Sequence, residues 1–504
     1  MITWINKIQR VILFTIHCSL FTSVALLTNV ALTSCDSYID ITPKGAITVD
    51  SVSQYYELIV IPQRCYNAAS YYMLSDDAWT KEDHIFGNEN RSFDGINFTF
   101  NEQADRTIIG DNNLYANIYA YIMRSNLVID NVDKALGDAD LKMLAKAESR
   151  VFRAWDHFLA INLYAKAYTP ETAAQDGGVC IVEHYDLEAQ PTKSTVAQVY
   201  DFIISELEAS VPLLKEHPVN IYHPNKAFGY ALLAQVYLFH HDWAKAKEAA
   251  EKSLELNDAL VDYNEINAYR RGLLDKNYGN KYGNDKNPEA LSYMWNGSSG
   301  WTAERANFLN YGMISPELVN LFKAENNDLR YTLFFYESGQ PTQYFDRGSG
   351  ADLWMEGVTT EVFMYPTIGM KTPEVYLTLA EAEARLGNLT VAEALVNKLR
   401  AHRLSGAVTA ISPSPATQQE MVKAIILERR KELLFGFHRF FDLKRLNTEP
   451  EYQTTITRQF PIVNVSAEHP QQTYTLRPDS RLYIIPFPRT ARDKNPNLTL
   501  NTDE

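Results

Sequence analysis

The chain of 504 residues lacks the short motifs that mark many enzyme active sites. It contains no His-Glu-x-x-His zinc motif, no nucleophile elbow, no Walker phosphate loop, no dinucleotide fingerprint and no Cys-x-x-Cys pair. Each of these motifs places particular side chains at the spacing that one reaction or cofactor needs. Their absence favours a binding protein over an enzyme, and we expect no metal or other cofactor.

Cysteine is also scarce, with four copies in the whole chain. Cys18 and Cys35 fall within or at the end of an N-terminal leader, which leaves Cys65 and Cys180 for the folded body. Two widely separated cysteines do not define a disulfide scaffold. Either a disulfide between them or two buried thiols fits the sequence.

Positive charge is in short supply, because 47 lysines and arginines face 62 acidic residues and the formal net charge is −15. Residues 1–34 carry two basic and no acidic side chains, so the charge without them is −17. Nucleic acid binding needs a basic face, which this composition does not favour. Adhesion to an anionic membrane by electrostatics alone is disfavoured for the same reason.

The N-terminus has the layout of a secretory leader. Its first ten residues include Lys7 and Arg10 and no acid, residues 11–32 are almost continuously apolar, and Leu-Thr-Ser precedes Cys35. This ending resembles the bacterial lipobox, in which the cysteine thiol is acylated and becomes the mature N-terminus. We therefore expect residues 1–34 to be a lipoprotein signal peptide and Cys35 to be the lipidation site. An uncleaved membrane anchor is the alternative, since the apolar run could span a bilayer.

Two later segments, residues 234–246 and 380–392, share an internal pattern. When Ala234 is aligned with Ala380, small alanines coincide and a polar residue or glycine falls at the centre of each segment. This pattern is typical of the tetratricopeptide helix–turn–helix, where small residues let two antiparallel helices approach closely. Two copies are too few for a solenoid, which needs about three or more. We therefore expect the helical pairs to pack on the remainder of one domain.

The surrounding sequence predicts the partners of these pairs. Helical periodicity is clear over 52–61, and residues 114–163 and 196–214 are expected to form degenerate helical pairs. Residues 66–100 and 262–370 instead contain turn-forming Gly, Asn and Ser residues and several aromatics, and they show little helical or strand periodicity. Long irregular segments in a compact domain are usually functional. We expect a mainly helical protein whose tetratricopeptide-like pairs pack with a loop-rich, irregular ligand-binding portion.

Isolated polar pairs give little support to catalysis. His240 and His241 are adjacent, and neighbouring helical positions do not converge on one metal ion. The acidic pairs at 76–77 and 82–83 resemble the carboxylates of a glycosidase, but that mechanism depends on their separation, which the sequence does not give.

Residues 425–445 combine dense alternating charge with large apolar side chains. We expect the apolar side chains to share the buried face of a core helix, with Glu428, Arg439 and Asp442 in an ion-pair network at its margin. Burying each large apolar side chain contributes roughly 1.5–3 kcal/mol, which favours a structural helix over an active site. The expected buried face comprises Ile426, Leu433, Phe437, Phe440 and Leu443.

Several segments taken in order resemble one family. They are Cys-Asp-Ser-Tyr-Ile-Asp-Ile-Thr-Pro-Lys-Gly from Cys35, then Arg153–Tyr164, Tyr376–Ala384, Glu428–Leu433, Ile484–Pro488 and Asn495–Leu498. Together they resemble the SusD/RagB family of outer-membrane nutrient-binding lipoproteins. The resemblance implies a single SusD-like domain over residues 35–504, anchored by lipid at the outer membrane and facing the cell exterior. It also implies that the domain sits on a SusC-like TonB-dependent transporter barrel and delivers glycan or oligosaccharide to it.

The same resemblance implies where the ligand binds, because in well-known members a glycan lies against aromatic side chains from two loops. Trp79 and Trp301 match those loops best, and an indole offers a broad, rigid surface to the C–H face of a sugar ring. Core packing is the alternative for each tryptophan. The other expected ligand-binding residues are the aromatic Trp295, Tyr71 and Tyr72 and the polar Asp76, Asp77 and Asn296.

Two alternative functions also fit the sequence. The same fold and transporter role could serve peptide cargo, since loop aromatics suit both ligands. A surface glycosidase is a third hypothesis, which the missing catalytic motifs disfavour.

Overall fold

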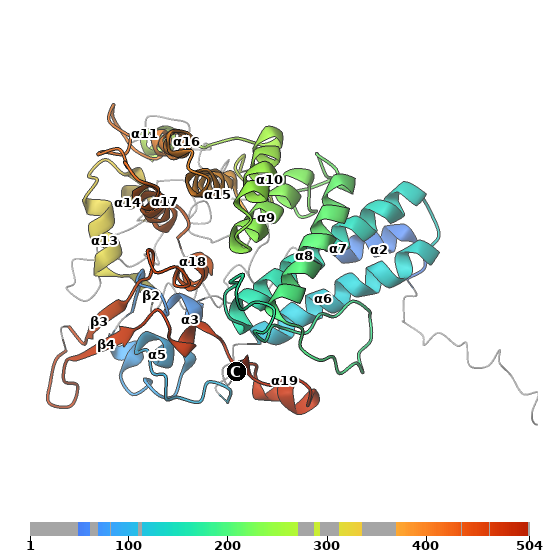
Figure 1. Ribbon diagram of the computed structural model, residues 1–504, viewed down its shortest axis with the longest axis horizontal. Coiled ribbons are helices and arrows are strands. Elements are labelled where there is room, and N and C mark those ends of the chain that lie inside the picture. Colours follow the sequence, from blue (N-terminus) through green and yellow to red (C-terminus); the bar gives the residue numbers. More distant parts are fainter. Residues whose placement is uncertain are drawn as a thin grey trace, which may run out of the picture. The chain divides into compact units, whose positions relative to one another are not determined.

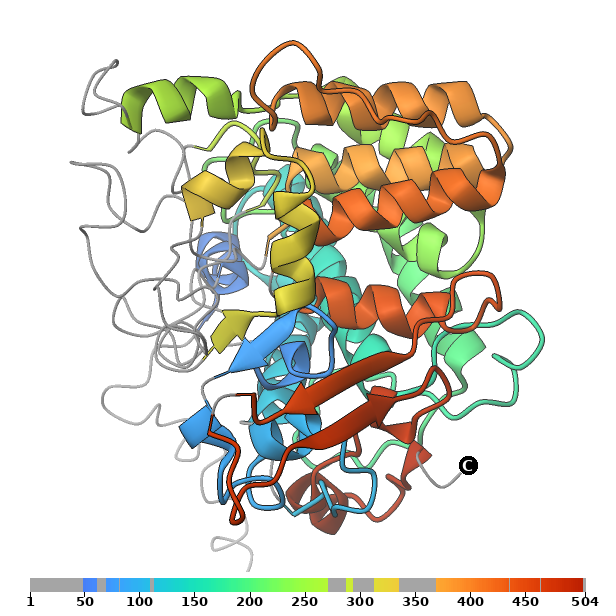
Figure 2. The same ribbon diagram turned by 90° about the vertical axis from the view of Figure 1, so that its left-hand side faces the viewer.

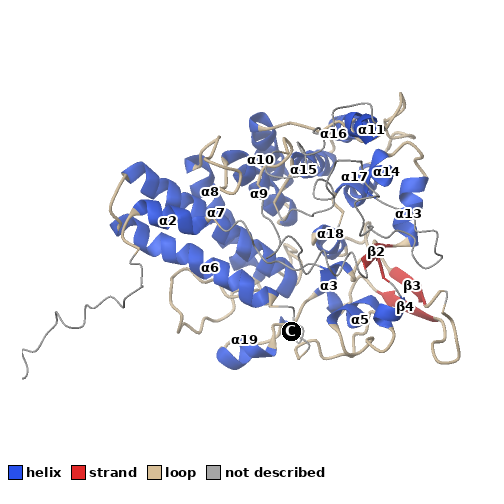
Figure 3. Ribbon diagram, turned by 180° about the vertical axis from the view of Figure 1, so that it is seen from behind, coloured by secondary structure: helices blue, strands red, loops and turns tan. Residues whose placement is uncertain are grey.

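The computed structural model describes residues 49–60, 69–80, 82–108, 113–270, 287–292, 312–334, 369–434, 436–462 and 464–501. The described residues from Ser51 onward form one compact unit. Helices dominate it, and the described strands form two small two-stranded sheets (Figure 3). The expected mainly helical fold is therefore confirmed. Within the described ranges, no helix is both long enough and apolar enough to cross a bilayer. The predicted leader and Cys35 lie outside these ranges.

The N-terminal part of the unit is a set of three packed helices. Helix α6 (Leu114–Asn131) and helix α7 (Ala139–Tyr164) are joined by the 3-10 turn η2 (Val132–Lys134), and α2 (Val52–Ile59) packs on both (Figure 1). Helical periodicity in the sequence of this region begins at Leu144, and helix α7 begins five residues earlier, at Ala139. Asp138 caps it, accepting the Leu141 N–H at 2.8 Å, and its first turn is largely solvent-exposed.

From Val151 to its end, α7 is buried around its whole circumference, although the sequence shows only one apolar stripe. The polar side chains in this stretch are satisfied internally. Arg153 donates to Glu206 at 2.8 Å, His157 Nδ1 lies 2.8 Å from a backbone carbonyl oxygen, and Asn162 donates to the Phe158 carbonyl at 2.9 Å. Buried polar groups are tolerated when they are hydrogen-bonded in this way.

The two segments with the shared pattern form two helical hairpins. The first comprises α9 (Lys226–Phe239) and α10 (Trp243–Leu256), and the second comprises α15 (Thr372–Arg385) and α16 (Leu389–Ala401). Both helices of each hairpin carry buried alanine, and the two helices of each hairpin contact one another. The predicted tetratricopeptide-like pairs are confirmed.

The turns of the two hairpins have the same backbone shape. His241 and Gly387, which align in the repeats, have φ values of +65° and +87°. The N–H groups of the next residues, Asp242 and Asn388, each donate to the carbonyl five residues earlier, at 3.0 and 2.9 Å. A left-handed residue is the usual way to end a helix, and glycine adopts it without strain.

A continuous stack connects the hairpins to their neighbours. Helix α8 (Val196–Ser210), with the 3-10 turn η3 (Val211–Leu213), packs against α7 and α9, and α10 packs against α15. Helix α17 (Gln418–Glu432) packs on α15 and α16. The predicted partners at 114–163 and 196–214 are thus the other members of the stack.

One prediction about the C-terminal segment is wrong. Residues 425–445 form two helices, because α17 ends at Glu432 and α18 (His438–Leu446) begins after Gly436, whose φ is +61°. The predicted apolar side chains are buried in part: Ile426, Phe437, Phe440 and Leu443 are in the core, and Leu433 at the break is half-buried.

Two small sheets and several short helices complete the unit. Strand β1 (Ala78–Thr80) pairs with β2 (Gly312–Ile314), and β3 (Ile456–Phe460) pairs with β4 (Gln472–Leu476), both antiparallel (Figure 2). The short helices are α3 (Ala69–Tyr72), α4 (Glu82–Ile85), α5 (Phe93–Phe98), α11 (Tyr263–Arg270), α13 (Pro316–Lys323), α14 (Leu329–Phe334), η7 (Arg481–Tyr483) and α19 (Arg489–Lys494).

Candidate functional site

The two loop-rich segments predicted to contact ligand are hydrogen-bonded to each other. Strand β1 belongs to the first segment and β2 to the second, with Trp79 opposite Met313 in the ladder. Just beyond the strands, the Ser315 N–H donates to the Asp77 carbonyl at 2.8 Å, and Ser315 Oγ donates to the Asp76 carbonyl at 2.6 Å. Ser315 also caps α13. The structure therefore brings together the two segments that the sequence proposes separately.

Trp79 lies in a hydrophobic cluster rather than on an open surface. Its side chain is 5% exposed and meets the rings of Phe98 and Phe460 edge-on, at centroid distances of 5.7 and 6.2 Å. Residues on both faces of β1 are buried, so either orientation of this side chain would point into the core. Trp79 is thus placed to stabilise the fold, and its role in ligand binding stays a prediction.

Tyr71 and Tyr72 are also buried. Tyr72 shares the cluster of Trp79 and donates its hydroxyl to the Asp77 carbonyl at 2.9 Å. Tyr71 packs against Phe93, Phe437 and Phe440, with centroid distances from 5.5 to 6.2 Å. These rings connect the first segment to α18, and their expected contact with ligand likewise stays a prediction.

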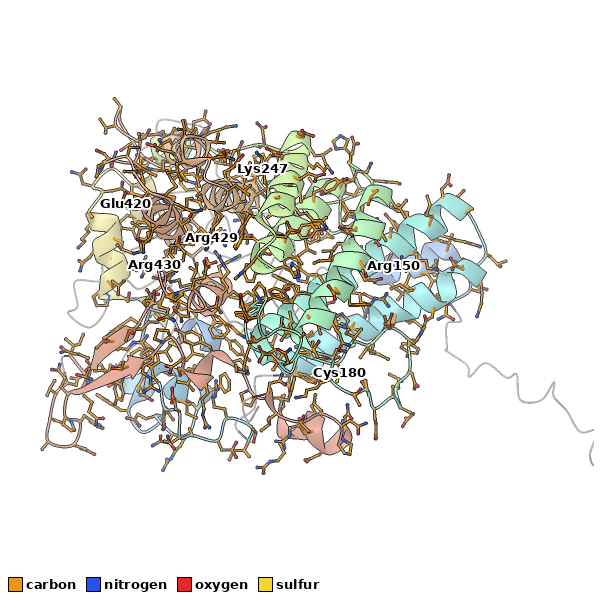
Figure 4. The ribbon with its side chains drawn as sticks, in the orientation of Figure 1. Arg150, Cys180, Lys247, Glu420, Arg429 and Arg430 are labelled. Carbon is orange, nitrogen blue, oxygen red and sulfur yellow. The ribbon has the colours of Figure 1, made fainter. Side chains whose placement is uncertain are left out.

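Asp76 and Asp77 are buried in a cluster that also contains Arg430 and Arg439, which we call the arginine–aspartate centre. Arg439 donates to both oxygens of Asp76 through Nε and Nη2, each at 2.7 Å. Arg430 donates to Asp77 Oδ1 at 2.9 and 2.6 Å, and its Nη2 lies 3.1 Å from Asp76 Oδ2. Figure 4 labels Arg430 on α17.

The electrostatics of this centre follow from its contacts. Burial by itself raises the pKa of Asp76, but the guanidinium groups of Arg439 and Arg430 outweigh it and lower that pKa to about 2. Asp76 is therefore ionised at neutral pH and its oxygens already accept charge-assisted hydrogen bonds. Burial instead raises the pKa of Asp77 to about 6, although Arg430 opposes this shift. The geometry thus assigns Asp76 and Asp77 to fixing the loop, and hydrogen bonding to a sugar hydroxyl stays a prediction for them.

A further arginine, which the sequence analysis did not identify, holds the same loop by its backbone. Arg458 of β3 is buried and donates to the carbonyls of Phe98, Ser75 and Ala78, the last two at 3.0 and 3.4 Å. Its guanidinium also lies 4.1 Å from the centroid of the Phe98 ring. The alternating burial of β3 places Arg458 on the inner face between Ile456 and Phe460, and this period is the signal that could have revealed it.

Charges on α17 extend the ion pairing toward the helical stack. The predicted network of Glu428, Arg439 and Asp442 is wrong in its pairing, because no described ion pair joins any two of them, and all three are buried rather than marginal. Asp442 instead pairs with Arg429, labelled in Figure 4, at 2.9 Å. Every charged residue from 428 to 432 has a partner: Glu428 with Arg330, Arg429 with Asp442, Arg430 with Asp77, Lys431 with Asp328 and Glu432 with Arg403.

Three of the four acidic side chains considered for a glycosidase site are engaged in contacts within the fold. Asp76 and Asp77 are committed to arginines, and Glu82 accepts the backbone N–H groups of Ile462 and Asn464 at 2.6 and 2.8 Å. In the described part of the chain, no group of three or more His, Cys, Asp or Glu could hold a metal ion. Cys180 is a buried free thiol, labelled in Figure 4, and burial raises its pKa to about 11. Cys65 lies outside the described residues.

Three of the predicted site residues also fall outside the described ranges. They are Trp295, Asn296 and Trp301. Their segment enters β2 at Gly312, so the chain that carries them joins the strand that is paired with β1.

Comparison with known proteins places the chain by sequence and by fold. The profile of the SusD family matches residues 275–503, and a profile described as starch-binding associating with outer membrane matches residues 48–238. The SusD-like protein P2 of Formosa agariphila is 24% identical over 445 residues, which cover 79% of this chain and 83% of that protein.

Solved structures agree in fold. A SusD superfamily protein from Bacteroides thetaiotaomicron superposes with a TM-score of 0.68 at 20% identity, over 89% of this chain and 98% of that one. A SusD-like carbohydrate binding protein from Bacteroides vulgatus superposes with a TM-score of 0.62, also at 20% identity, over 89% and 95%. With residues 275–503 and 48–238 matched by SusD-type profiles and a SusD-like protein as a relative, the chain belongs to the SusD/RagB family.

Proposed function

We propose that this protein is a lipid-anchored protein of the outer-membrane surface that captures oligosaccharide and passes it to a SusC-like TonB-dependent transporter, without catalysis. The observation that carries the proposal is the match of both halves of the chain to the family, one of them to a profile described by starch binding at the outer membrane. The leader that ends at Cys35 supports the lipid anchor. Two acyl chains on such a cysteine would give the stable attachment that one chain does not.

The proposed ligand site lies where the two loop-rich segments meet. Residues 75–80 of the first segment are held in place by three sets of contacts: the arginine–aspartate centre, Arg458 and the β1–β2 ladder. Such a platform lowers the ordering cost of binding, because the loop is already held in place before the ligand arrives. Trp301 is the residue we assign to stacking on the sugar ring, since Trp79 has a place in the core.

Affinity electrophoresis in gels containing a panel of polysaccharides tests the binding function. Delivered cargo must be released, so we expect dissociation constants from micromolar to millimolar, about −8 to −4 kcal/mol. Trp301→Ala should abolish retardation in the gel and leave the thermal unfolding midpoint unchanged. If it lowers the midpoint and leaves retardation intact, the site assignment is wrong. Peptides recovered by native mass spectrometry, with no polysaccharide retarding the protein, would replace glycan by peptide as the cargo.

Trp79→Ala serves as the matched control, because it removes the same side chain from the buried cluster. We expect it to cost about 3–5 kcal/mol of unfolding free energy, measured by urea denaturation. Unchanged stability together with loss of glycan binding would move Trp79 from the core to the ligand site.

The anchor and the partner need a separate test in cells. Labelled palmitate should enter the wild-type protein and not Cys35→Ala, and the transporter should copurify with the wild type from outer membranes. Palmitate incorporation that survives Cys35→Ala would contradict the assigned lipidation site.

A further inference from the structure

An open groove lies on the helical stack, beside the N-terminal half of α7. Its volume is about 460 Å³, and η2, α7, and the C-terminal end of α8 with η3 line it. Lys142, Lys146 and Arg150 project along it from α7. They follow one another at intervals of four residues, which puts successive cations on one face of a helix and about 6 Å apart along its axis. Figure 4 labels Arg150 on this helix.

The cations of this groove outnumber its acids. Asp133 is the acidic side chain among the described residues that line it, and it pairs with Lys146 at 2.5 Å. Lys142 has a long contact of 3.4 Å to a backbone carbonyl of η2. Arg150 Nε lies 3.5 Å from Glu206, whose carboxylate already accepts two hydrogen bonds from Arg153. Three cations against one carboxylate stand out in a chain whose net charge is −15.

The apolar part of the lining is aliphatic. Met143 and Leu213 are 48% and 44% exposed, and no aromatic ring is among the described residues that line the groove. Stacking of a neutral sugar on a flat ring is therefore not the chemistry offered here. The groove offers regularly spaced positive charge next to a narrow aliphatic strip.

These features suit a polymeric ligand that carries negative charge at regular intervals. An extended peptide would find no unpaired strand edge here, because helices form the walls and their backbone groups are already bonded. A saccharide chain needs no such edge, since its anionic groups can meet the ammonium and guanidinium groups while its C–H faces contact the aliphatic strip. The net negative charge of the chain would oppose binding of the same polymer elsewhere, so binding would concentrate at the groove.

We propose that this groove is a second saccharide-binding site, selective for polysaccharide that carries carboxylate or sulfate groups. Lys142, Lys146 and Arg150 bind the anionic groups, and Met143 and Leu213 contact the sugar rings. The inference rests on the proposed glycan-binding function and names a ligand class for it.

Isothermal titration of the full-length protein in detergent, with two matched pairs of polymers, tests the proposal. The pairs are polygalacturonate with its methyl ester, and dextran sulfate with dextran. The test variant is Lys142→Gln/Lys146→Gln/Arg150→Gln. The control, Lys245→Gln/Lys252→Gln/Lys398→Gln, changes the net charge equally at exposed lysines elsewhere.

We expect the wild type to bind the charged member of at least one pair at least about tenfold more tightly than its neutral member, and 0.5 M salt to remove the difference. The test variant should lose this preference and keep its thermal unfolding midpoint, and the control should retain the preference. Equal preference in the test variant and the wild type would overturn the proposal. So would equal loss in both variants, no preference in the wild type, or displacement of the polymer by a lower concentration of polyglutamate.

The failure of this inference can be told apart from failure of the proposed function. If neutral polysaccharide binds in a way that depends on Trp301, and charged polysaccharide binds no more tightly, the groove proposal is wrong and the proposed function is retained. If no polysaccharide of any kind binds the wild type, the proposed function fails and the groove site fails with it.

Discussion

The arginine–aspartate centre and the groove on α7 use the same kinds of charge in opposite ways. In the centre, Asp76 is 6% exposed and every guanidinium meets a carboxylate at hydrogen-bond distance. In the groove, the side chain of Asp133 is 61% exposed and the cations exceed their partners. A buried charge must be matched inside the fold, whereas an exposed one is stabilised by water. The arginine–aspartate centre therefore stabilises the fold, whereas the cations of the groove are available to a ligand.

The largest expected effect comes from breaking the centre. Arg439→Met removes both bonds to Asp76 and leaves a buried carboxylate with one remaining guanidinium. We expect a loss of about 3–5 kcal/mol of unfolding free energy, measured by urea denaturation. Arg477→Met is the control, because it deletes the same group from an exposed pair with Asp479 and should cost less than about 1 kcal/mol. Equal losses in the two variants would erase the distinction drawn between the buried and exposed charges.

The second largest effect is expected from acid, because protonation of the buried carboxylates should lower the free energy of unfolding. Glu381 pairs with Arg445 and Arg385, and although burial raises its pKa, the arginines lower it to about 2. Because this pKa and that of Asp76 lie below their unfolded values, the two carboxylates stabilise the fold fully above about pH 4.5. That stability is lost as the pH falls from about 4.5 toward 2.

The measurement is the unfolding midpoint in urea at successive pH values. Wild type should lose on the order of 2–3 kcal/mol per carboxylate across this window. Glu381→Gln should start lower and show a shallower slope. A slope in the variant that equals the wild-type slope would mean that Glu381 is not one of the groups that titrate.

The smallest effect is expected in the groove. Lys146→Gln removes an exposed ion pair with Asp133, so the unfolding free energy should change by less than about 1 kcal/mol, and by less still at high salt. Thermal unfolding at low and high salt measures this. A cost comparable to that of Arg439→Met would make Lys146 a structural residue.

The helical hairpins were predictable because their signal is local. Alanines that recur at helical spacing around a turn report the close approach of two neighbouring helices, and both hairpins form as expected. The two aligned repeats differ at one turn position, where the first has a histidine and the second a glycine. His241 takes the left-handed position that Gly387 fills in the second hairpin, and its ring stacks on Trp243 at 4.9 Å. A periodicity argument does not see backbone angles of this kind.

The candidate site was only partly predictable, because its contacts join residues that are far apart in the chain. The two loop-rich segments were identified from their composition, but Asp76 and Arg439 are 363 positions apart and no local pattern connects them. Trp79 shows the same limit, since a tryptophan in a loop-rich segment looks the same in sequence whether it packs on Phe460 or faces solvent. Residue type identified the candidates, and tertiary pairing decides their roles.

The partners of residues 73–78 have a consequence for the order in which the chain folds. This stretch depends on Arg430, Arg439 and Arg458, which are synthesised more than 350 residues later. Contacts between such distant residues form slowly, since a long loop must close before any of them is gained. Until these arginines have been synthesised, Asp76 and Asp77 lack the cations that pair with them in the folded protein. Trp79 likewise lacks Phe460 of β3, against which it packs. A chain truncated before α17 would therefore leave this N-terminal stretch exposed and prone to aggregation, however complete the first helical hairpin is.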